Sequence, residues 1–302
     1  MKRITLFIIL TAFFLFNSQV SFGDKKIRGS GHVVTEEREV KNITGVELAT
    51  IGDLYIEVGE KEKLEIEAED NIILYLETRV HRGVLKIDKR KNVNLKPKRD
   101  IIYYLTVKKL ERIKISSAGD VFAPDLRADR FFIEVSSAGD LEMGDLDANS
   151  VDIEMSSAGD VDIENINTEK MKVSISSAGD LKTKDLDLDL LKVHMSSAGD
   201  FWIRNLLAET LELINTSAGT MEIEGGKVRG QDVTLSSAGN YNAKNLESIE
   251  ATVHLSSVGS ATINVKDYLD ASVSSMGSVY YIGNPTVDSR VTSMGRIKKI
   301  RD

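Results

Sequence analysis

The residues best placed to do chemistry are the aspartates and serines of a motif, Ser-Ser-Ala-Gly-Asp, that recurs along the chain. Equivalent positions of a repeat stack in space, and stacked carboxylates repel one another unless a cation lies between them. Calcium prefers carboxylate oxygens, so a column of motif aspartates is a candidate metal site. The alternative is that each aspartate hydrogen-bonds its own corner of the backbone and faces water. The candidate ligands, twenty residues apart, are Asp120, Asp140, Asp160, Asp180 and Asp200.

The serines of the motif do not suggest a catalytic site. A serine lies two residues before the glycine in all ten copies, whereas a nucleophile needs one serine beside one base. The only histidines are His32, His81, His194 and His254, and none is next to a motif serine in the sequence. We therefore predict no catalytic residue. We expect these serines to point inward and to form a ladder of stacked hydroxyls.

The single tryptophan, Trp202, is a candidate ligand-binding residue. It falls at an outward position of the repeat, in the same column as Phe122 four units earlier. An exposed aromatic ring offers a large contact area to a glycan or a protein partner. Isolated surface aromatics are also common in proteins that bind neither.

The spacing of the motif also indicates the fold that positions these residues. Its glycines are twenty residues apart from Gly119 to Gly259, and two steps of eighteen lead on to Gly277 and Gly295. Apolar and polar residues alternate within each unit, which is the period of a β-strand with one buried face. Such a unit buries its apolar side chains only by stacking on its neighbours. The sequence predicts an all-β fold, a parallel β-helix or solenoid with roughly 20-residue rungs.

A second position punctuates each unit, six residues after the glycine. Asn, Asp or Gly occupies it, and these residues favour tight turns and tolerate left-handed backbone conformations. We therefore predict two corners in each rung, one at the glycine and one at this Asx position. The Asx residues are Asp125, Asp145, Asn165, Asp185, Asn205 and Asn245.

The chain divides into three parts along its length. Residues 1–23 contain two basic residues, an apolar run and small residues before a cleavage point, which is typical of a signal peptide. Residues 24–110 are less regular and predict an N-terminal cap with the first rungs, including one at residues 46–58 and a basic loop at residues 89–99. Residues 111–302 hold the regular repeats and continue the same domain.

Composition narrows the range of partners and cofactors. The net charge is −8, and removal of the two basic residues of the signal peptide makes it about −10. This excess of carboxylates argues against binding nucleic acid or an anionic membrane surface through net charge. The absence of cysteine excludes disulfides and a lipid on an N-terminal cysteine. No membrane span is expected after signal cleavage, and calcium is the only cofactor that the residues suggest.

The repeat resembles the family called putative auto-transporter adhesin, head GIN domain. The residues that carry the resemblance are the Ser-Ser-Ala-Gly-Asp units, the segment 46–58 and the closing segment 277–285, and the resemblance covers about residues 40–298. It implies a right-handed single-stranded parallel β-helix. It also implies export from a bacterial cell and no assigned catalytic residue.

Two classes of function remain open. The first is a non-enzymatic protein of the cell envelope or surface, periplasmic, associated with the outer membrane or extracellular, that presents a repetitive adhesin-like face to a protein or glycan. The second is a polysaccharide-acting, lyase-like β-helix or a calcium-dependent glycan-binding one. An enzyme of this kind needs long loops to build a cleft, and rungs of constant length leave little material for them. The sequence favours the first class.

Overall fold

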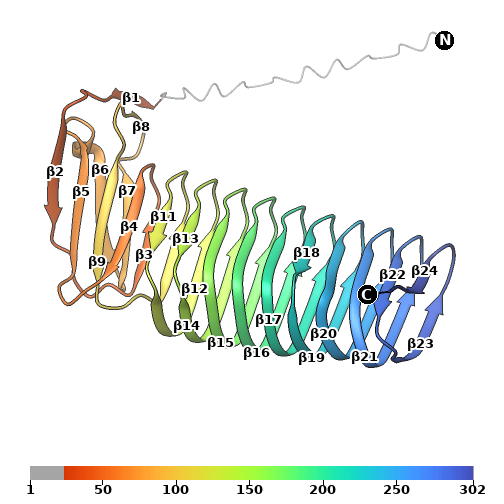
Figure 1. Ribbon diagram of the computed structural model, residues 1–302. Coiled ribbons are helices and arrows are strands. Elements are labelled where there is room, and N and C mark those ends of the chain that lie inside the picture. The colour runs from red at the N-terminus through yellow and green to blue at the C-terminus, as the bar shows by residue number, and fades with distance from the viewer. Residues whose placement is uncertain (1–23, 302) are drawn as a thin grey trace, which may run out of the picture.

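A computed structural model describes residues 24–301 as a solenoid of stacked β-strands with a β-rich cap at its N-terminal end (Figure 1). The predicted signal peptide, residues 1–23, lies outside the described residues. Within the described range, no helix has the length and apolar character needed to cross a membrane. The only helical element found there is a single 3-10 turn, η1 (Ile73–Tyr75).

Successive repeat units stack as parallel rungs, as the alternating pattern predicts. Strands of neighbouring rungs pair at an offset of twenty residues, so that Val173 lies beside Val193 and Val193 beside Leu213. The predicted parallel β-helix is confirmed. The strands of the repeat are β10 (Arg112–Ile115), β11 (Val121–Ala123), β12 (Leu126–Val135), β13 (Leu141–Met143), β14 (Leu146–Met155), β15 (Val161–Ile175), β16 (Leu181–Met195), β17 (Phe201–Asn215), β18 (Thr220–Ile223), β19 (Gly226–Leu235), β20 (Asn240–Leu255), β21 (Ser260–Val273), β22 (Ser278–Ile282), β23 (Thr286–Val291) and β24 (Arg296–Lys299).

The alternating apolar side chains form continuous columns inside the solenoid. Ile153, Val173 and Leu213 are each at most 1% exposed. Full burial of such a side chain contributes about 1.5–3 kcal/mol. Because every rung repeats these positions, the columns supply most of the favourable free energy of folding.

One polar network interrupts the apolar interior, between β19, β20 and β21. Tyr241 Oη donates to Gln231 Oε1 at 2.9 Å, and Gln231 Nε2 donates to Ser248 Oγ at 2.7 Å. Ser248 Oγ in turn donates to the main-chain oxygen of Asn264 at 2.8 Å. The three side chains are at most 3% exposed. Burial raises the pKa of Tyr241 far above its usual value, so the phenol is a neutral donor in this network.

Glycine is required at the motif corner because the backbones of successive rungs meet there. A Cβ atom on Gly159 would lie 2.2 Å from the main-chain oxygen of Gly139 and 2.7 Å from that of Ser137. The obstacle is backbone, which cannot move aside without opening the ladder between rungs. The predicted glycine corner is thus confirmed, and close approach rather than positive φ is its cause.

The Asx corner has a different basis from the one predicted. None of its Asp or Asn residues has positive φ, and β15, β16 and β17 run through the corner without a break. The side chains instead reach along the solenoid axis. The Asp145 N–H donates to Asp125 Oδ1 at 2.9 Å, and Asn165 Nδ2 donates to Asp145 Oδ1 at 2.7 Å. The prediction of left-handed turns was therefore wrong, because these residues serve to bond one rung to the next.

The motif serines are structural, but they do not form the predicted hydroxyl ladder. Ser137 Oγ donates to the main-chain oxygen of Ser117, and Ser177 is the only serine of its column that is fully buried among the described residues. The first residue of the Ser-Ser pair bonds similarly: the hydroxyls of Ser136 and Thr216 donate to main-chain oxygens of the preceding rung at 3.4 and 3.3 Å. These two carbonyls also accept the backbone N–H of the same residue, at 2.9 Å in each case, so the hydroxyl adds a second bond to the oxygen.

The cap extends the solenoid with strands that are not stacked in sequence order. The less regular segment, predicted as a cap, consists mainly of strands. The rung at residues 46–58 lies against the first regular repeat, with Val46 beside Ile113. On its other side lie later residues, Leu85 beside Val46 and Tyr103 beside Leu54. The cap strands are β2 (Val33–Arg38), β3 (Gly45–Leu48), β4 (Asp53–Val58), β5 (Lys63–Glu69), β6 (Leu76–His81), β7 (Val84–Lys89) and β9 (Ile102–Val107).

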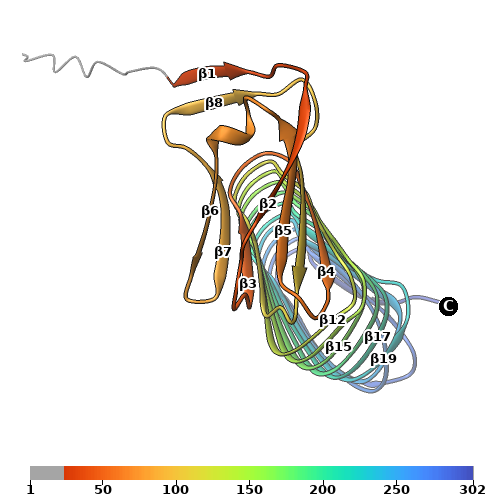
Figure 2. The same cartoon turned by 90° about the vertical axis from the view of Figure 1, so that its left-hand side faces the viewer.

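Antiparallel pairing closes the N-terminal end of the solenoid. β5 pairs antiparallel with both β9 and β2, and β6 pairs antiparallel with β7. The predicted basic loop at residues 89–99 contains a strand, β8 (Val93–Lys96), which pairs in parallel with β1 (Lys25–Arg28). Viewed along the solenoid, β1 and β8 stand apart from the stacked rungs (Figure 2). We call this two-stranded element, residues 24–28 and 89–100, the β1–β8 lobe.

Candidate functional site

The motif aspartates lie on the outside of the solenoid and bond the backbone of the next rung. The Asp160 N–H donates to Asp140 Oδ1 at 2.8 Å, and the Asp180 N–H donates to Asp160 Oδ1 at 2.8 Å. The same contact links Asp120 to the Asp140 N–H and Asp180 to the Asp200 N–H. Each carboxylate therefore accepts a hydrogen bond from the backbone N–H of the next rung. The alternative prediction, that each aspartate bonds its own corner, does not describe these contacts.

This arrangement bears on the predicted calcium ladder. Over residues 24–301, no three Asp, Glu or His side chains gather in a way that would hold a metal ion. Calcium takes six to eight oxygen ligands, and successive aspartates here each commit one oxygen to an amide. Asp53 lies beside Asp120 at the cap end of this column, and burial, followed by the charges of Asp120 and Asp100, raises the pKa of Asp53. The geometry supports a structural role, and calcium binding stays a prediction.

Trp202 lies on the same outward side of the repeat, at the position where it was predicted. Its indole Nε1 donates to Glu224 Oε1 at 3.2 Å, and the side chain is half-buried. It borders an open depression of about 400 Å³ together with Lys182, Asp200 and Glu222. One exposed ring edge beside charged side chains can accept a polar ligand, whereas the other candidate aromatic, Phe122, is four rungs away.

Phe122 belongs to a stack of three aromatic rings that the sequence did not reveal. Tyr55 lies between Phe122 and Tyr104, with ring centroids 4.7 Å and 5.8 Å apart. The rings cover each other's faces, so the stack offers mainly edges to solvent and stabilises the junction of β9, β4 and β11. Burial, followed by Glu67, raises the pKa of Tyr104. The alternating pattern indicates that Tyr55 and Tyr104 point outward from their strands. Nothing in the sequence spacing indicates that the two rings are neighbours.

A concave feature follows the Asx corner across five rungs. It is a groove of about 680 Å³ that contains five carboxylates. Arg127 lies 3.3 Å from Asp147 and Arg204 lies 2.6 Å from Asp185, whereas Asp125, Asp145 and Asp187 have no cation within 4 Å among the described residues. Asp125 and Asp145 each accept a hydrogen bond from the next rung, and Asp187 accepts none there. Since each rung adds an Asx residue and the outward residue two positions later, acceptors recur at the rung spacing of about 4.8 Å. The lining side chains include Asp125, Asp145, Asp147, Asn165, Asn167, Asp185, Asp187, Asn205 and Leu207.

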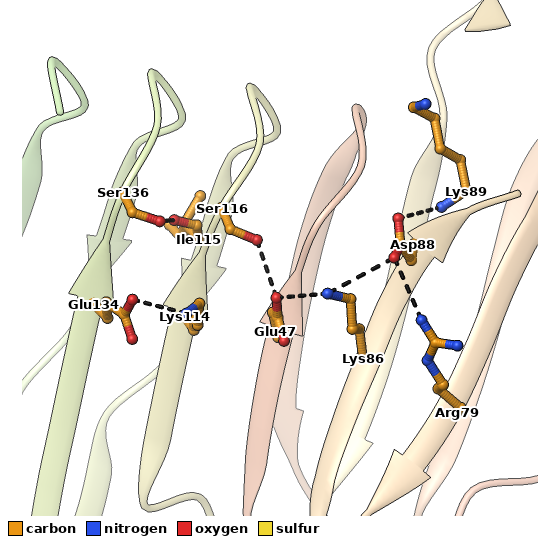
Figure 3. Close-up of polar contacts among 10 residues, drawn as sticks. All are labelled: Glu47, Arg79, Lys86, Asp88, Lys89, Lys114, Ile115, Ser116, Glu134 and Ser136. Carbon is orange, nitrogen blue, oxygen red and sulfur yellow. Dashed lines mark hydrogen bonds and ion pairs between the residues drawn. The ribbon is translucent and has the colours of Figure 1, made fainter. Parts of the chain in front are cut away.

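A ladder of charged side chains joins the cap to the first repeats on the face formed by β7, β3, β10 and β12 (Figure 3). Lys86 Nζ lies 2.9 Å from Glu47 Oε1 and 3.7 Å from Asp88 Oδ2. Lys114 Nζ lies 2.7 Å from Glu134 Oε1 in the same view. The charges alternate and neutralise one another, so this ladder holds the two parts together rather than binding a charged ligand. Sequence spacing did not predict it, because Glu47 and Lys86 belong to rungs that are out of sequence order.

One histidine lies next to a serine, although not a motif serine. His254 Nδ1 is 2.7 Å from Ser272 Oγ on the exposed side of β20 and β21. A catalytic pair of this kind needs a third group that orients the imidazole. No carboxylate within residues 24–301 contacts His254. The pair is a cross-strand contact between surface residues.

The stacked rungs and their repeating surface columns define the chain as a β-solenoid protein. The family model described as putative auto-transporter adhesin, head GIN domain, matches residues 42–205 and 186–285, and the chain belongs to this family. Comparison with curated proteins gave no match.

Two solved structures share the fold. A putative adhesin from Parabacteroides distasonis ATCC 8503 is 18% identical, with a TM-score of 0.53 over 91% of this chain and 100% of that one. A putative adhesin from Parabacteroides merdae ATCC 43184 is 16% identical, with a TM-score of 0.50 over 91% of this chain and 99% of the other.

Proposed function

We propose that the protein is a non-enzymatic, exported protein of the cell envelope or surface that binds a glycan along the groove of its Asx corner. The single observation that carries the proposal is the groove itself, in which an Asp or Asn recurs at the Asx corner of five successive rungs. Sugar hydroxyls need closely spaced hydrogen-bond acceptors, and carboxylate and amide oxygens supply them. Membership of a family described as adhesins supports the same role.

The regularity of the rungs supports a binding role over a catalytic one. β15, β16 and β17 each run unbroken for fifteen residues, so no loop between the two corners rises above the surface in these rungs. Such a surface binds a chain by many weak contacts along its length.

The proposal is tested with a glycan array probed by residues 24–302. We expect binding to neutral polysaccharides and expect Asp187→Ala to weaken it, because Asp187 is the groove carboxylate with neither a cation nor an inter-rung hydrogen bond among the described residues. Asp232→Ala is the matched control, since Asp232 is equally exposed on β19 away from the groove. Equal binding by wild type and Asp187→Ala would exclude the groove. Repeating the array with a chelator distinguishes calcium-dependent from calcium-independent binding, and Trp202→Ala reports on the depression beside the motif column.

A further inference from the structure

The β1–β8 lobe carries a dense positive charge that the net charge of the chain hides. Nine lysines and arginines and two aspartates lie in residues 24–28 and 89–100, a net charge of +7. The solenoid, residues 111–302, has nineteen basic and thirty-one acidic residues, a net charge of −12. The expectation that this protein avoids anionic surfaces follows from the total charge and does not apply to the lobe taken alone.

The lobe is firmly mounted on the cap. Ile27, Val93 and Leu95 point inward and are at most 9% exposed. The fully buried Glu69 accepts a hydrogen bond from the Lys98 amide, which ties the second segment of the lobe to the end of β5. The first segment is held by Asn71, whose Nδ2 donates to the main-chain oxygen of Arg28 at 2.7 Å. The outward side chains are therefore presented on a fixed surface.

The basic side chains of this surface are not neutralised by the protein. Of the nine, only Arg90 has a carboxylate within 4 Å among the described residues, Glu77 at 3.8 Å. Arg28 and Lys96 are even cross-strand partners in the parallel register, and like charges at such positions destabilise a sheet. By contrast, four solenoid lysines have a carboxylate of an adjacent rung within 4 Å, namely Lys114, Lys184, Lys192 and Lys266. Water stabilises these exposed charges in the free protein, and an anionic surface would in addition relieve their mutual repulsion.

An exposed apolar side chain adjoins the charges. Leu74 in η1 is 66% exposed. Arg90 donates to its main-chain oxygen at 3.5 Å, and the ring of the next residue, Tyr75, lies 5.6 Å from Lys25 Nζ and 5.3 Å from the Arg90 guanidinium. A basic surface with an apolar residue and an interfacial tyrosine is the combination that binds anionic bilayers, where the charges meet headgroups and the apolar group enters the interface.

We propose that the β1–β8 lobe docks on the surface of an anionic lipid bilayer. The unpaired cations of the lobe match anionic headgroups, and the exposed Leu74 matches the apolar side of the interface. An acidic polysaccharide would match the charges but gives no role to Leu74. The acidic solenoid is repelled by the same surface, which directs it away from the bilayer.

The test is sedimentation of residues 24–302 with phosphatidylcholine vesicles and with vesicles of equimolar phosphatidylcholine and phosphatidylglycerol. We expect binding only to the second, weakened by salt. The triple variant Lys26→Glu, Arg28→Glu, Lys96→Glu should reduce the partition coefficient more than about tenfold. Each basic residue near such a surface raises that coefficient about fivefold. The matched control reverses three exposed solenoid lysines without carboxylate partners: Lys170→Glu, Lys182→Glu, Lys244→Glu.

Two further variants separate binding from folding and lipid from glycan. Arg28→Glu should raise the denaturation midpoint, since it creates an opposite-charge pair with Lys96, while it lowers vesicle binding. Leu74→Ser should weaken binding to vesicles and leave binding to heparin unchanged. Equal partitioning of the triple variant and wild type would overturn the proposal. A second pair of results would also overturn it: heparin bound as tightly as vesicles, and no effect of Leu74→Ser on vesicle binding. Together they would assign the lobe to an acidic polysaccharide.

Discussion

The buried network of Tyr241, Gln231 and Ser248 gives the sharpest quantitative prediction. Replacing Tyr241 by Phe removes one hydroxyl and leaves Gln231 Oε1, buried at 3% exposure, without its donor. An unsatisfied buried acceptor costs about 1–3 kcal/mol, so we expect Tyr241→Phe to lower the free energy of unfolding by that amount. Tyr268→Phe is the control, because Tyr268 is 43% exposed and its change should be within about 0.5 kcal/mol.

The double-mutant cycle with Gln231→Met isolates the hydrogen bond. Gln231→Met alone leaves the Tyr241 hydroxyl without its acceptor. In the double variant both side chains are apolar and similar in shape to the ones they replace. Ser248 keeps its bond to the Asn264 oxygen in every variant. We therefore expect the double variant to be about 1 kcal/mol more stable than the sum of the two single effects predicts.

Urea unfolding followed by circular dichroism measures these differences, with the slope of the transition compared among variants to check that the same structure unfolds. A coupling energy of zero would refute the reasoning, because it would mean that Tyr241 and Gln231 contribute independently. A Tyr241→Phe variant as stable as wild type would show that water enters this part of the solenoid.

Three other perturbations test the corners and the outer surface. Gly159→Ala should prevent close stacking and lower stability by about 3 kcal/mol or more in a urea titration, whereas Gly230→Ala, with nothing nearer than 3.5 Å, should fold normally. Tyr55→Ala removes two aromatic pairs and should cost about 1–3 kcal/mol, measured as a lower denaturation midpoint. The raised pKa of Asp53 means that the folded state holds its proton more tightly than the unfolded state, so stability falls as pH rises from about 4. Thermal melts at several pH values should show Asp53→Asn more stable than wild type at neutral pH, and a less stable variant would contradict the assignment.

The repeat itself was predictable because one rule, equal spacing, governs every copy. Residues twenty apart, such as Val173 and Val193, must be neighbours if the units stack, and they are. The rule also predicted the outward positions of Asp140 and Trp202. It gave no information on whether a corner residue would turn the chain or bond the next rung, since Asp and Asn do both.

The cap shows what equal spacing leaves out. Its strands do not repeat. Residues 84–107 fold back and pair with the rung at residues 46–58 on the side away from the regular repeats. The contacts made there, including the pair of Tyr55 and Tyr104 and the pair of Glu47 and Lys86, depend on that return. No periodicity encodes it, so these residues were recognisable only from the structure.

The glycine corner has a consequence for how such a protein changes length. Because each rung is twenty residues and meets its neighbours through the same backbone contact, insertion or loss of one whole unit creates no new kind of contact. The eighteen-residue steps mark the limit of this tolerance. Between β20 and β21, Ala243 pairs with Ile263, and the next pair is Glu247 with Asn264. A bulge at this point accommodates the shorter unit. The length of the solenoid is therefore set by the number of units. Duplication of one unit moves its far end about 4.8 Å further from the β1–β8 lobe.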